Sequence, residues 1–420
     1  CFFTQSLDHF KVILYNGRIN NKTMVYNVIF TRELAAVLKR YTKFPVIALI
    51  GPRQSGKTTL VKNTFPHHKF LSLDDAVNQA FAADDPEGFL LTHENEHGII
   101  LDEFQYAPKL TTYIKLEADK KNRPGYFVLT GSQNFLVNKA ITDSLAGRVG
   151  ILTLLPMANK ELLANQLVAI THTEAIFNGN YPRIYADQIL PTEFYPSYIL
   201  SYIQRDVANL INVKNIATFR KFVQLCAGRI GQLCNVNALA TETGISAPTA
   251  KEWLSILEAS YILFFLEPHF KNFNKVLIKT PKLYFFDTGL ACSLLRINSV
   301  EALSNSPFQG ALFESLVIAD LYKQYCNQGL PLSLYFWRDK GGAHEIDCIL
   351  DQGIKSYPIE IKASNVIASD AFRGIEYWNK LANADPRDAY LIYAGTERQI
   401  RKNGNVLNWC DASDLVKKLN

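Results

Sequence analysis

The stretch that decides the fold is PVIALIGPRQSGKTTL, residues 45–60. It begins with a short, continuous apolar run, 46–50, of the kind expected for a buried parallel strand. Residues 51–58 then fit GxxxxGK[ST] at every fixed position. The glycines allow backbone amides to turn toward phosphate oxygens, and a helix opening at Lys57 adds its positive end. Strand, loop and helix together predict a phosphate-binding loop.

The loop predicts ATP and Mg²⁺ as ligands. Lys57 is expected to reach the β- and γ-phosphates, and the Thr58 hydroxyl to ligate magnesium. The predicted nucleotide-binding residues are Gly51, Pro52, Arg53, Gln54, Ser55, Gly56, Lys57, Thr58, Thr59 and Asp102.

Three further apolar runs follow along the chain, in KFLSLDD, HGIILDE and PGYFVLTGS. Each ends in polar residues, and the segments between them are long enough for helices. This alternation predicts an α/β fold, a P-loop NTPase parallel sheet with helices on both faces. Ligands bind at the carboxyl ends of such strands.

Asp102 and Glu103 close the third run. We expect Asp102 beside the magnesium, and Glu103 near the attacking water as the base that accepts its proton. The presence of Glu103 favours hydrolysis over binding alone. The alternative is a pair of solvated acids at the end of a strand.

Two further polar positions are candidates for the catalytic site. Ser132, with Gln133 as second choice, is predicted to contact the γ-phosphate or to orient the water; the alternative is a simple polar turn. Arg148 is predicted to stabilise charge on the transferring phosphoryl group, in cis or across a subunit boundary. A surface salt bridge is the other interpretation of Arg148.

Many separated motifs carry a family resemblance: GPRQSGKTT, LDD (73–75), DDPEGFL, ILDEFQYAP, LTGSQ, SLAGR, YIQRDV (202–207), KTPKLYFFDTGL (279–290) and FESLV (313–317). Together they resemble the prokaryotic AAA-type ATPases that carry a C-terminal domain of unknown function, DUF4143. The resemblance covers nearly all of 24–420. It implies an ATPase core, a winged-helix segment and a nuclease-like C-terminal fold, and it strengthens Arg148 as a functional arginine.

The residues after Pro156 give their own signals. The segment 160–225 is rich in Tyr and Leu and is expected to be mostly helical. In 235–290, two short helices around a Gly turn and a β-rich sequence suggest a winged helix-turn-helix. The candidate recognition helix, 246–257, presents Lys251 but also Glu252, so a packing module remains the alternative to a DNA reader.

The C-terminal part contains a second set of acidic residues. Strand alternation predicts Glu345, Asp347 and Ile349 on one face, and Glu360 with Lys362 on a neighbouring strand. Asp347 and Glu360 are predicted to hold a divalent metal, with Glu314 as a third acid and Lys362 to orient water. The set resembles a PD-(D/E)xK nuclease. A nuclease fold used only for binding is the alternative.

Composition sets the remaining limits. The chain has 420 residues, 48% hydrophobic and 20% charged, with net charge +5, typical of a globular protein. No apolar run reaches the roughly 18 residues of a membrane span. Seven cysteines without a CxxC pair predict a reduced, cytoplasmic protein. The HExxH sequence at 93–97 is not expected to be a zinc protease motif, because Gly98 ends any helix there.

These observations predict an organisation: 1–23, a non-native or disordered extension before the initiator Met24; 24–158, the ATPase domain; 159–225, a helical lid; 226–300, the winged helix-turn-helix; 305–420, a small nuclease-like α/β domain. An ordinary N-terminal extension is the alternative for 1–23. The predicted function is Mg²⁺-dependent ATP hydrolysis that controls the C-terminal domains, with DNA or RNA and self-association through Arg148 as partner hypotheses. A nucleic-acid effector with ATP as a ligand switch is the alternative.

Overall fold

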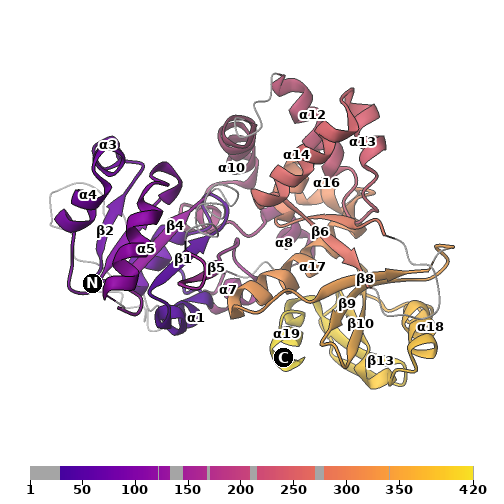
Figure 1. Cartoon of the computed structure of the whole chain (residues 1–420). Helices are drawn as coiled ribbons and strands as arrows, with labels where there is room; N and C mark the ends of the chain where they lie inside the picture. The colour runs from indigo at the N-terminus through magenta and orange to yellow at the C-terminus, as the bar shows by residue number, and fades with distance from the viewer. Residues whose placement is uncertain are drawn as a thin grey trace, which may run out of the picture.

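The computed structural model describes residues 29–121, 123–132, 145–167, 171–208, 215–269, 279–339 and 341–419. The predicted extension 1–23, Met24 and Gln133 lie outside the described residues. Figure 1 shows the first sheet and its helices in indigo and purple, a helical region between, and a second sheet in orange and yellow.

The N-terminal part is built on a five-stranded parallel sheet in the order β2-β3-β4-β1-β5. Its strands are β1 (Val46–Ile50), β2 (Lys69–Ser72), β3 (Ile99–Asp102), β4 (Phe127–Gly131) and β5 (Val149–Thr153). β1 and β4 are buried throughout, which explains their continuous apolar sequences. The predicted fold class is confirmed, and β4 lies between the P-loop strand and the acidic strand β3.

Helices cover both faces of this sheet. On one face, Ile47 and Leu49 pack with α1 (Leu34–Arg40) and α2 (Lys57–Thr64). On the other, Ala48 packs with helices including α5. The helices of this second group are α3 (Ala76–Asp84), α4 (Pro86–Thr92) and α5 (Leu110–Lys121). Alternate residues of β1 therefore enter different cores, as the period of a strand requires.

The fifth strand, β5, was not among the strands predicted from the sequence. It lies at the edge of the sheet beside β1, and its residues alternate between buried and partly exposed positions. The strand therefore lacks the continuous apolar run by which the four others were recognised.

A helical region follows the first sheet, as expected. Its elements are α7 (Asn159–Ala164), α8 (His172–Asn178), α9 (Pro182–Ala186), α10 (Pro191–Tyr198), the π-helix η3 (Ile199–Val207), α12 (Ile216–Ala227), α13 (Val236–Thr243), α14 (Ala247–Ala259), α15 (Thr288–Leu294) and α16 (Val300–Ser304). Between α13 and α14, Gly244 has φ +82°, the left-handed conformation that favours glycine. The side chain of Ser246 then caps α14 by accepting from the Thr249 N–H.

The second sheet has eight strands in the order β12-β13-β11-β10-β9-β8-β6-β7. They are β6 (Leu263–Pro268), β7 (Lys282–Phe285), β8 (Leu334–Arg338), β9 (Glu345–Asp351), β10 (Ser356–Lys362), β11 (Tyr390–Tyr393), β12 (Gln399–Arg401) and β13 (Gly404–Asn408). The antiparallel pair β6–β7 follows α14, and β6 also pairs with β8. The strands β6 and β7, which precede the predicted boundary at 300–305, therefore belong to the same sheet as the strands of the C-terminal domain.

One long helix joins the two halves. The helix α17 (Gln309–Gln328) contacts α1 and β5 of the first part, and β7 and β10 of the second. Two shorter helices complete the C-terminal part, α18 (Arg373–Ala382) and α19 (Asp414–Leu419). Within the described ranges, no helix has the length and apolar character needed to cross a membrane.

Candidate functional site

The P-loop connects β1 to α2 through three positive φ angles, at Gly51, Gln54 and Gly56. A Cβ atom on Gly51 would lie 2.1 Å from the Leu154 carbonyl oxygen. Gly51 is thus required both by its conformation and by the close approach of the segment after β5. The turn brings the first backbone amides of α2 to the carboxyl end of the sheet, as the sequence predicts.

Lys57 lies against this loop and is buried. Its Nζ donates to the carbonyl oxygens of Gly51, at 3.0 Å, and Pro52, at 2.8 Å. Burial lowers the pKa of Lys57 to about 8, although Glu103 and Asp102 act in the opposite direction. The ammonium group is therefore poorly solvated, which favours its interaction with an anion that enters the site.

Asp102 ends β3 and faces the start of α2. The Thr58 hydroxyl donates to both carboxylate oxygens of Asp102, at 3.1 and 2.9 Å. The Thr130 hydroxyl, on β4, also donates to this carboxylate. A hydroxyl and a carboxylate this close are oxygen ligands of the type that Mg²⁺ prefers, so the residues fit the ion.

Glu103 follows directly, with φ +54°, a left-handed conformation that is uncommon outside glycine. Its Oε2 accepts from the Ser132 hydroxyl at 3.0 Å and from the Gln105 side-chain amide. Ser132 thus holds the carboxylate of Glu103. Gln105 had no predicted role, although it stands within the ILDEFQYAP motif, two residues after Glu103.

A cavity of about 750 Å³ opens beside these residues. The P-loop contributes Arg53, Gln54, Gly56, Lys57, Thr58 and Thr59, and Glu103 also lines it. Of the other predicted binding residues, Ser55 is fully buried and donates to the Pro52 carbonyl oxygen at 3.0 Å. The volume lies in the range of small-molecule sites, which is about 300–1,000 Å³.

Two walls of the cavity were not predicted. Phe30 and Ala35 come from the segment that precedes β1, and Pro182 and Arg183 come from α9 of the helical region. The Arg183 guanidinium pairs with Asp187 at 2.9 Å, one helical turn away. Segments far apart in the sequence thus enclose the nucleotide-binding residues.

Arg32 is a buried cation that the sequence analysis did not single out. Its guanidinium pairs with Glu161 at 3.0 Å and donates to the carbonyl oxygens of Ser55, at 2.7 Å, and Leu155, at 2.8 Å. Arg32 is 6% exposed and Glu161 is fully buried. Through these contacts the ion pair connects the P-loop to the segment that leads into α7.

Arg148 lies far from the phosphate site of its own chain. It precedes β5, and its carbonyl oxygen accepts from the Val46 N–H at the amino end of β1. The P-loop follows the opposite end of β1, and the five residues of this strand separate the two ends by about 16 Å. The guanidinium pairs with Asp119 of α5. A cis contact with the γ-phosphate is therefore incompatible with this arrangement.

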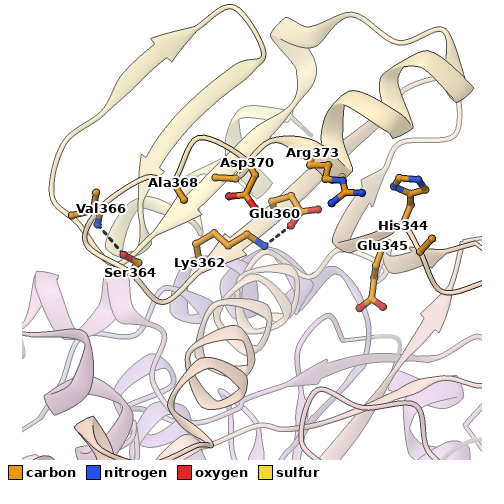
Figure 2. A pocket seen from close by; sticks show the side chains of 12 residues that line it. His344, Glu345, Glu360, Lys362, Ser364, Val366, Ala368, Asp370 and Arg373 are labelled. Carbon is orange, nitrogen blue, oxygen red and sulfur yellow. Dashed lines mark hydrogen bonds and ion pairs between the residues drawn. The ribbon is translucent and has the colours of Figure 1, made fainter.

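The C-terminal acidic residues converge near β9 and β10. Lys362 Nζ lies 2.8 Å from Glu360 Oε2 and 3.8 Å from Asp347 Oδ2. Burial, followed by the charge of Asp347, raises the pKa of Glu360. Figure 2 shows Glu360 and Lys362 in a pocket of about 330 Å³, together with Arg373 and His344.

The alternation predicted for β9 is wrong at Ile349. Tyr335 pairs with Ile349 but Trp337 pairs with Ile346, so β9 holds one residue more than β8 in this interval. Such a bulge reverses the alternation beyond it. Ile349 therefore packs in the same core as Ile346, while Asp347 accepts a hydrogen bond from the Ile361 N–H at 2.8 Å.

The structure brings Asp347, Glu360 and Lys362 together on the paired strands β9 and β10, and their role as a second metal site stays a prediction. Glu314 interacts instead with Lys282 of β7, at 3.2 Å, and with the Tyr284 hydroxyl. Among the residues that the structure describes, no group of three or more His, Cys, Asp or Glu side chains is placed to hold a metal ion. The HExxH sequence likewise lies outside any helix, because α4 ends at Thr92.

Three family models match successive parts of the chain. An AAA domain matches residues 43–163, a domain of unknown function (DUF8612) matches 171–301, and a second one (DUF4143) matches 309–411. The chain therefore carries an AAA domain followed by a C-terminal DUF4143 domain, the combination that the resemblance implies. The predicted family is confirmed.

Similar proteins occur in bacteria and archaea. An uncharacterized protein of Mycobacterium tuberculosis is 29% identical over 338 residues, which cover 80% of this chain and 74% of the relative. One of Methanocaldococcus jannaschii is 23% identical over 353 residues, covering 75% and 77%. Among solved structures, a Walker-type ATPase of Pyrococcus abyssi gives a TM-score of 0.43 at 15% identity and covers 64% of this chain and 96% of that chain.

Proposed function

We propose that this chain hydrolyses ATP with Mg²⁺ at the P-loop, and that the hydrolytic cycle changes the arrangement of the helical and C-terminal regions. In this proposal Lys57 binds the β- and γ-phosphates, and Thr58 and Asp102 hold the ion. Bound magnesium neutralises charge on the phosphate oxygens. Glu103 accepts the proton of the attacking water, and Ser132 keeps its carboxylate in place.

The observation that carries the proposal is that Lys57, Thr58 and Glu103 line one cavity, while Asp102 accepts the hydrogen bond of the Thr58 hydroxyl beside it. Lys57 begins α2, Asp102 ends β3, and Glu103 follows it directly. The hydrogen bond from Ser132 to Glu103 restrains the carboxylate on the cavity wall. A base held in a fixed position needs no reorganisation when the water reacts. A site that only retained nucleotide would have no use for it.

Contacts of Tyr202 support a link between this site and the helical region. Tyr202 lies on η3, and the Arg53 guanidinium stands 5.9 Å from the centre of its ring. The Tyr202 hydroxyl lies 3.5 Å from the Ser132 carbonyl oxygen and 3.2 Å from that of Ser260, just after α14. A change at Ser132 or Arg53 is therefore transmitted to the end of α14.

A second link supports the proposal at α17. The Asp320 carboxylate accepts from the Asn159 N–H at 2.7 Å, at the start of α7. Lys323, one turn later, donates to the Met157 carbonyl oxygen at 3.2 Å. The same helix carries Glu314 in the C-terminal acidic cluster. Because a helix transmits displacement along its length, α17 can relate the ATPase domain to the second sheet.

The test is ATP turnover and binding in three variants. We expect Glu103→Gln to retain ATP and lose most turnover, because an amide cannot accept the proton, and Lys57→Ala to bind ATP weakly. Asp84→Asn, at an exposed position of α3, is the matched control and should behave like the parent. Parent-level turnover by Glu103→Gln would refute the base. Slow turnover with tight ATP retention in the parent would instead favour ATP as a ligand switch.

The proposal extends to self-association through Arg148. Because Arg148 lies away from its own phosphate site and is partly exposed, a role in hydrolysis requires a neighbouring subunit. We expect Arg148→Ala to lose turnover, and a mixture of Arg148→Ala with Glu103→Gln to recover part of it. The recovery would come from sites that combine an intact Glu103 with a neighbour's Arg148. Normal turnover by Arg148→Ala would contradict this role.

A further inference from the structure

Lys282 brings a buried positive charge into the C-terminal acidic cluster. It is the first residue of β7, where it pairs with Leu266 of β6 and forms a bridge with Leu233. Its side chain is only 4% exposed. A lysine is rarely buried to this extent without anionic partners.

Two carboxylates from different elements meet at this ammonium group. Glu314 of α17 lies 3.2 Å from Nζ, and Glu345 of β9 also pairs with it. Glu314 accepts a further hydrogen bond, at 2.5 Å, from the Tyr284 hydroxyl. The other oxygen of Glu345 lies 3.3 Å from the Arg338 guanidinium. Both carboxylates are thus neutralised by protein cations.

The other two acids of the cluster are also partnered. Glu360 pairs with Lys362, and Asp347 accepts from the Ile361 N–H and lies near Lys362. Figure 2 shows Glu345 extending away from Glu360 and Lys362. The Glu345 carboxylate therefore points towards Lys282 and away from the other acidic side chains that a bound metal would need as ligands.

These contacts do not fit a divalent metal. Mg²⁺ requires several oxygen ligands at about 2.0–2.1 Å in near-octahedral geometry. Here one oxygen of Glu314 and one of Glu345 already bind the ammonium, and a divalent ion that shared them would be repelled by it. An ammonium group offers three donors, which suits two carboxylates without further ligands.

We propose that Lys282 is the resident cation of the C-terminal acidic cluster and takes the place of a divalent metal. The ion pairs of Lys282 also link β7 to α17 and to β9, so the cluster stabilises the packing of these three elements. This inference goes beyond the proposed function, because it concerns a site outside the ATPase domain and does not depend on turnover.

The test measures Mn²⁺ binding to the full chain without nucleotide, from the electron paramagnetic resonance signal of the free ion. Four proteins are compared: the parent, Asp347→Asn, Lys282→Met, and Lys282→Met/Glu314→Gln, which removes one of the two carboxylates that contact Lys282. Any binding at the P-loop is common to all four and cancels. Lys355→Met removes an exposed lysine from the turn between β9 and β10 and serves as the matched control.

We expect the parent and Asp347→Asn to bind Mn²⁺ identically. Lys282→Met should gain one site and bind Mn²⁺ at least about tenfold more tightly than the parent does, because the two partly buried carboxylates of Glu314 and Glu345 lose their counter-ion. The second substitution should remove that site, and Lys355→Met should gain none. A site in the parent that Asp347→Asn abolishes would overturn the proposal, as would a folded Lys282→Met variant without a new site. If circular dichroism shows that Lys282→Met does not fold, the proposal is tested by the parent and Asp347→Asn alone. Equal Mn²⁺ binding by these two proteins supports it, and weaker binding by Asp347→Asn overturns it.

Discussion

The buried pair of Arg32 and Glu161 provides the sharpest test of what holds the ATPase domain together. Replacing Arg32 by Met keeps a long side chain in the space but removes the charge. Glu161, which is fully buried, then lacks a counter-ion. The carbonyl oxygens of Ser55 and Leu155 lose the donors that now lie within 2.8 Å.

The contacts set the size of the effect. Breaking a buried ion pair by removing one partner costs about 3–5 kcal/mol. Glu161 keeps two backbone donors, the N–H groups of Glu33 at 2.8 Å and Ala158 at 2.9 Å. These bonds stabilise the remaining carboxylate, so we expect the lower end of the range, about 3 kcal/mol.

The assay is urea unfolding followed by circular dichroism, with the free energy taken from the first transition because the chain has several parts. Arg32→Met/Glu161→Gln should be less destabilised than Arg32→Met, since the uncompensated charge is gone. Arg40→Met is the control: Arg40 is exposed and its hydrogen bond to the Gln328 carbonyl oxygen is long, at 3.4 Å. We expect a change within about 0.5 kcal/mol there. A loss under about 1 kcal/mol for Arg32→Met, or a double variant as unstable as both single losses combined, would refute the reasoning.

Two further predictions concern the links between the ATPase domain and the rest of the chain. Burial raises the pKa of Asp320 from 3.8 to about 6. The native carboxyl group therefore holds its proton to higher pH than the carboxyl group of the unfolded chain. The free energy of unfolding should fall by about 3 kcal/mol as the pH rises between these two pKa values, and it should stay level above them. Asp320→Asn should remove this slope in urea unfolding measured from pH 4 to pH 7; an unchanged slope would show that another group causes it. Tyr202→Phe removes the hydroxyl near Ser132 and Ser260, so ATP turnover should change while ATP affinity stays the same. Equal turnover in this variant and the parent would show that the hydroxyl does not relate the two regions.

The sequence was sufficient for features that depend on neighbouring residues. A continuous apolar run and the GxxxxGK[ST] spacing located β1, the P-loop and the start of α2, because strand burial and loop conformation are local. Asp102 and Glu103 were placed correctly at the end of β3 for the same reason. The edge strand β5 was missed because only alternate residues of the strand are buried.

Features that depend on distant residues could not be predicted. Arg32 lies 129 residues from Glu161, and nothing near either residue indicates the pairing. Lys282 was quoted within a family motif, but its contact with Glu314 exists only because β7 joins the second sheet. The bulge in β9 arises from the pairing of two strands, so the alternation of one strand cannot reveal it.

The continuous second sheet decides where the polypeptide can be divided for study in isolation. A fragment that starts at residue 305 lacks β6 and β7 and leaves the edge of β8 without the partner it has at Glu267 and Pro268. A bare row of backbone donors and acceptors is a template for pairing with other chains. Such a fragment is expected to aggregate during expression, whereas one that starts at residue 215 retains all eight strands and is the sounder choice for crystallisation.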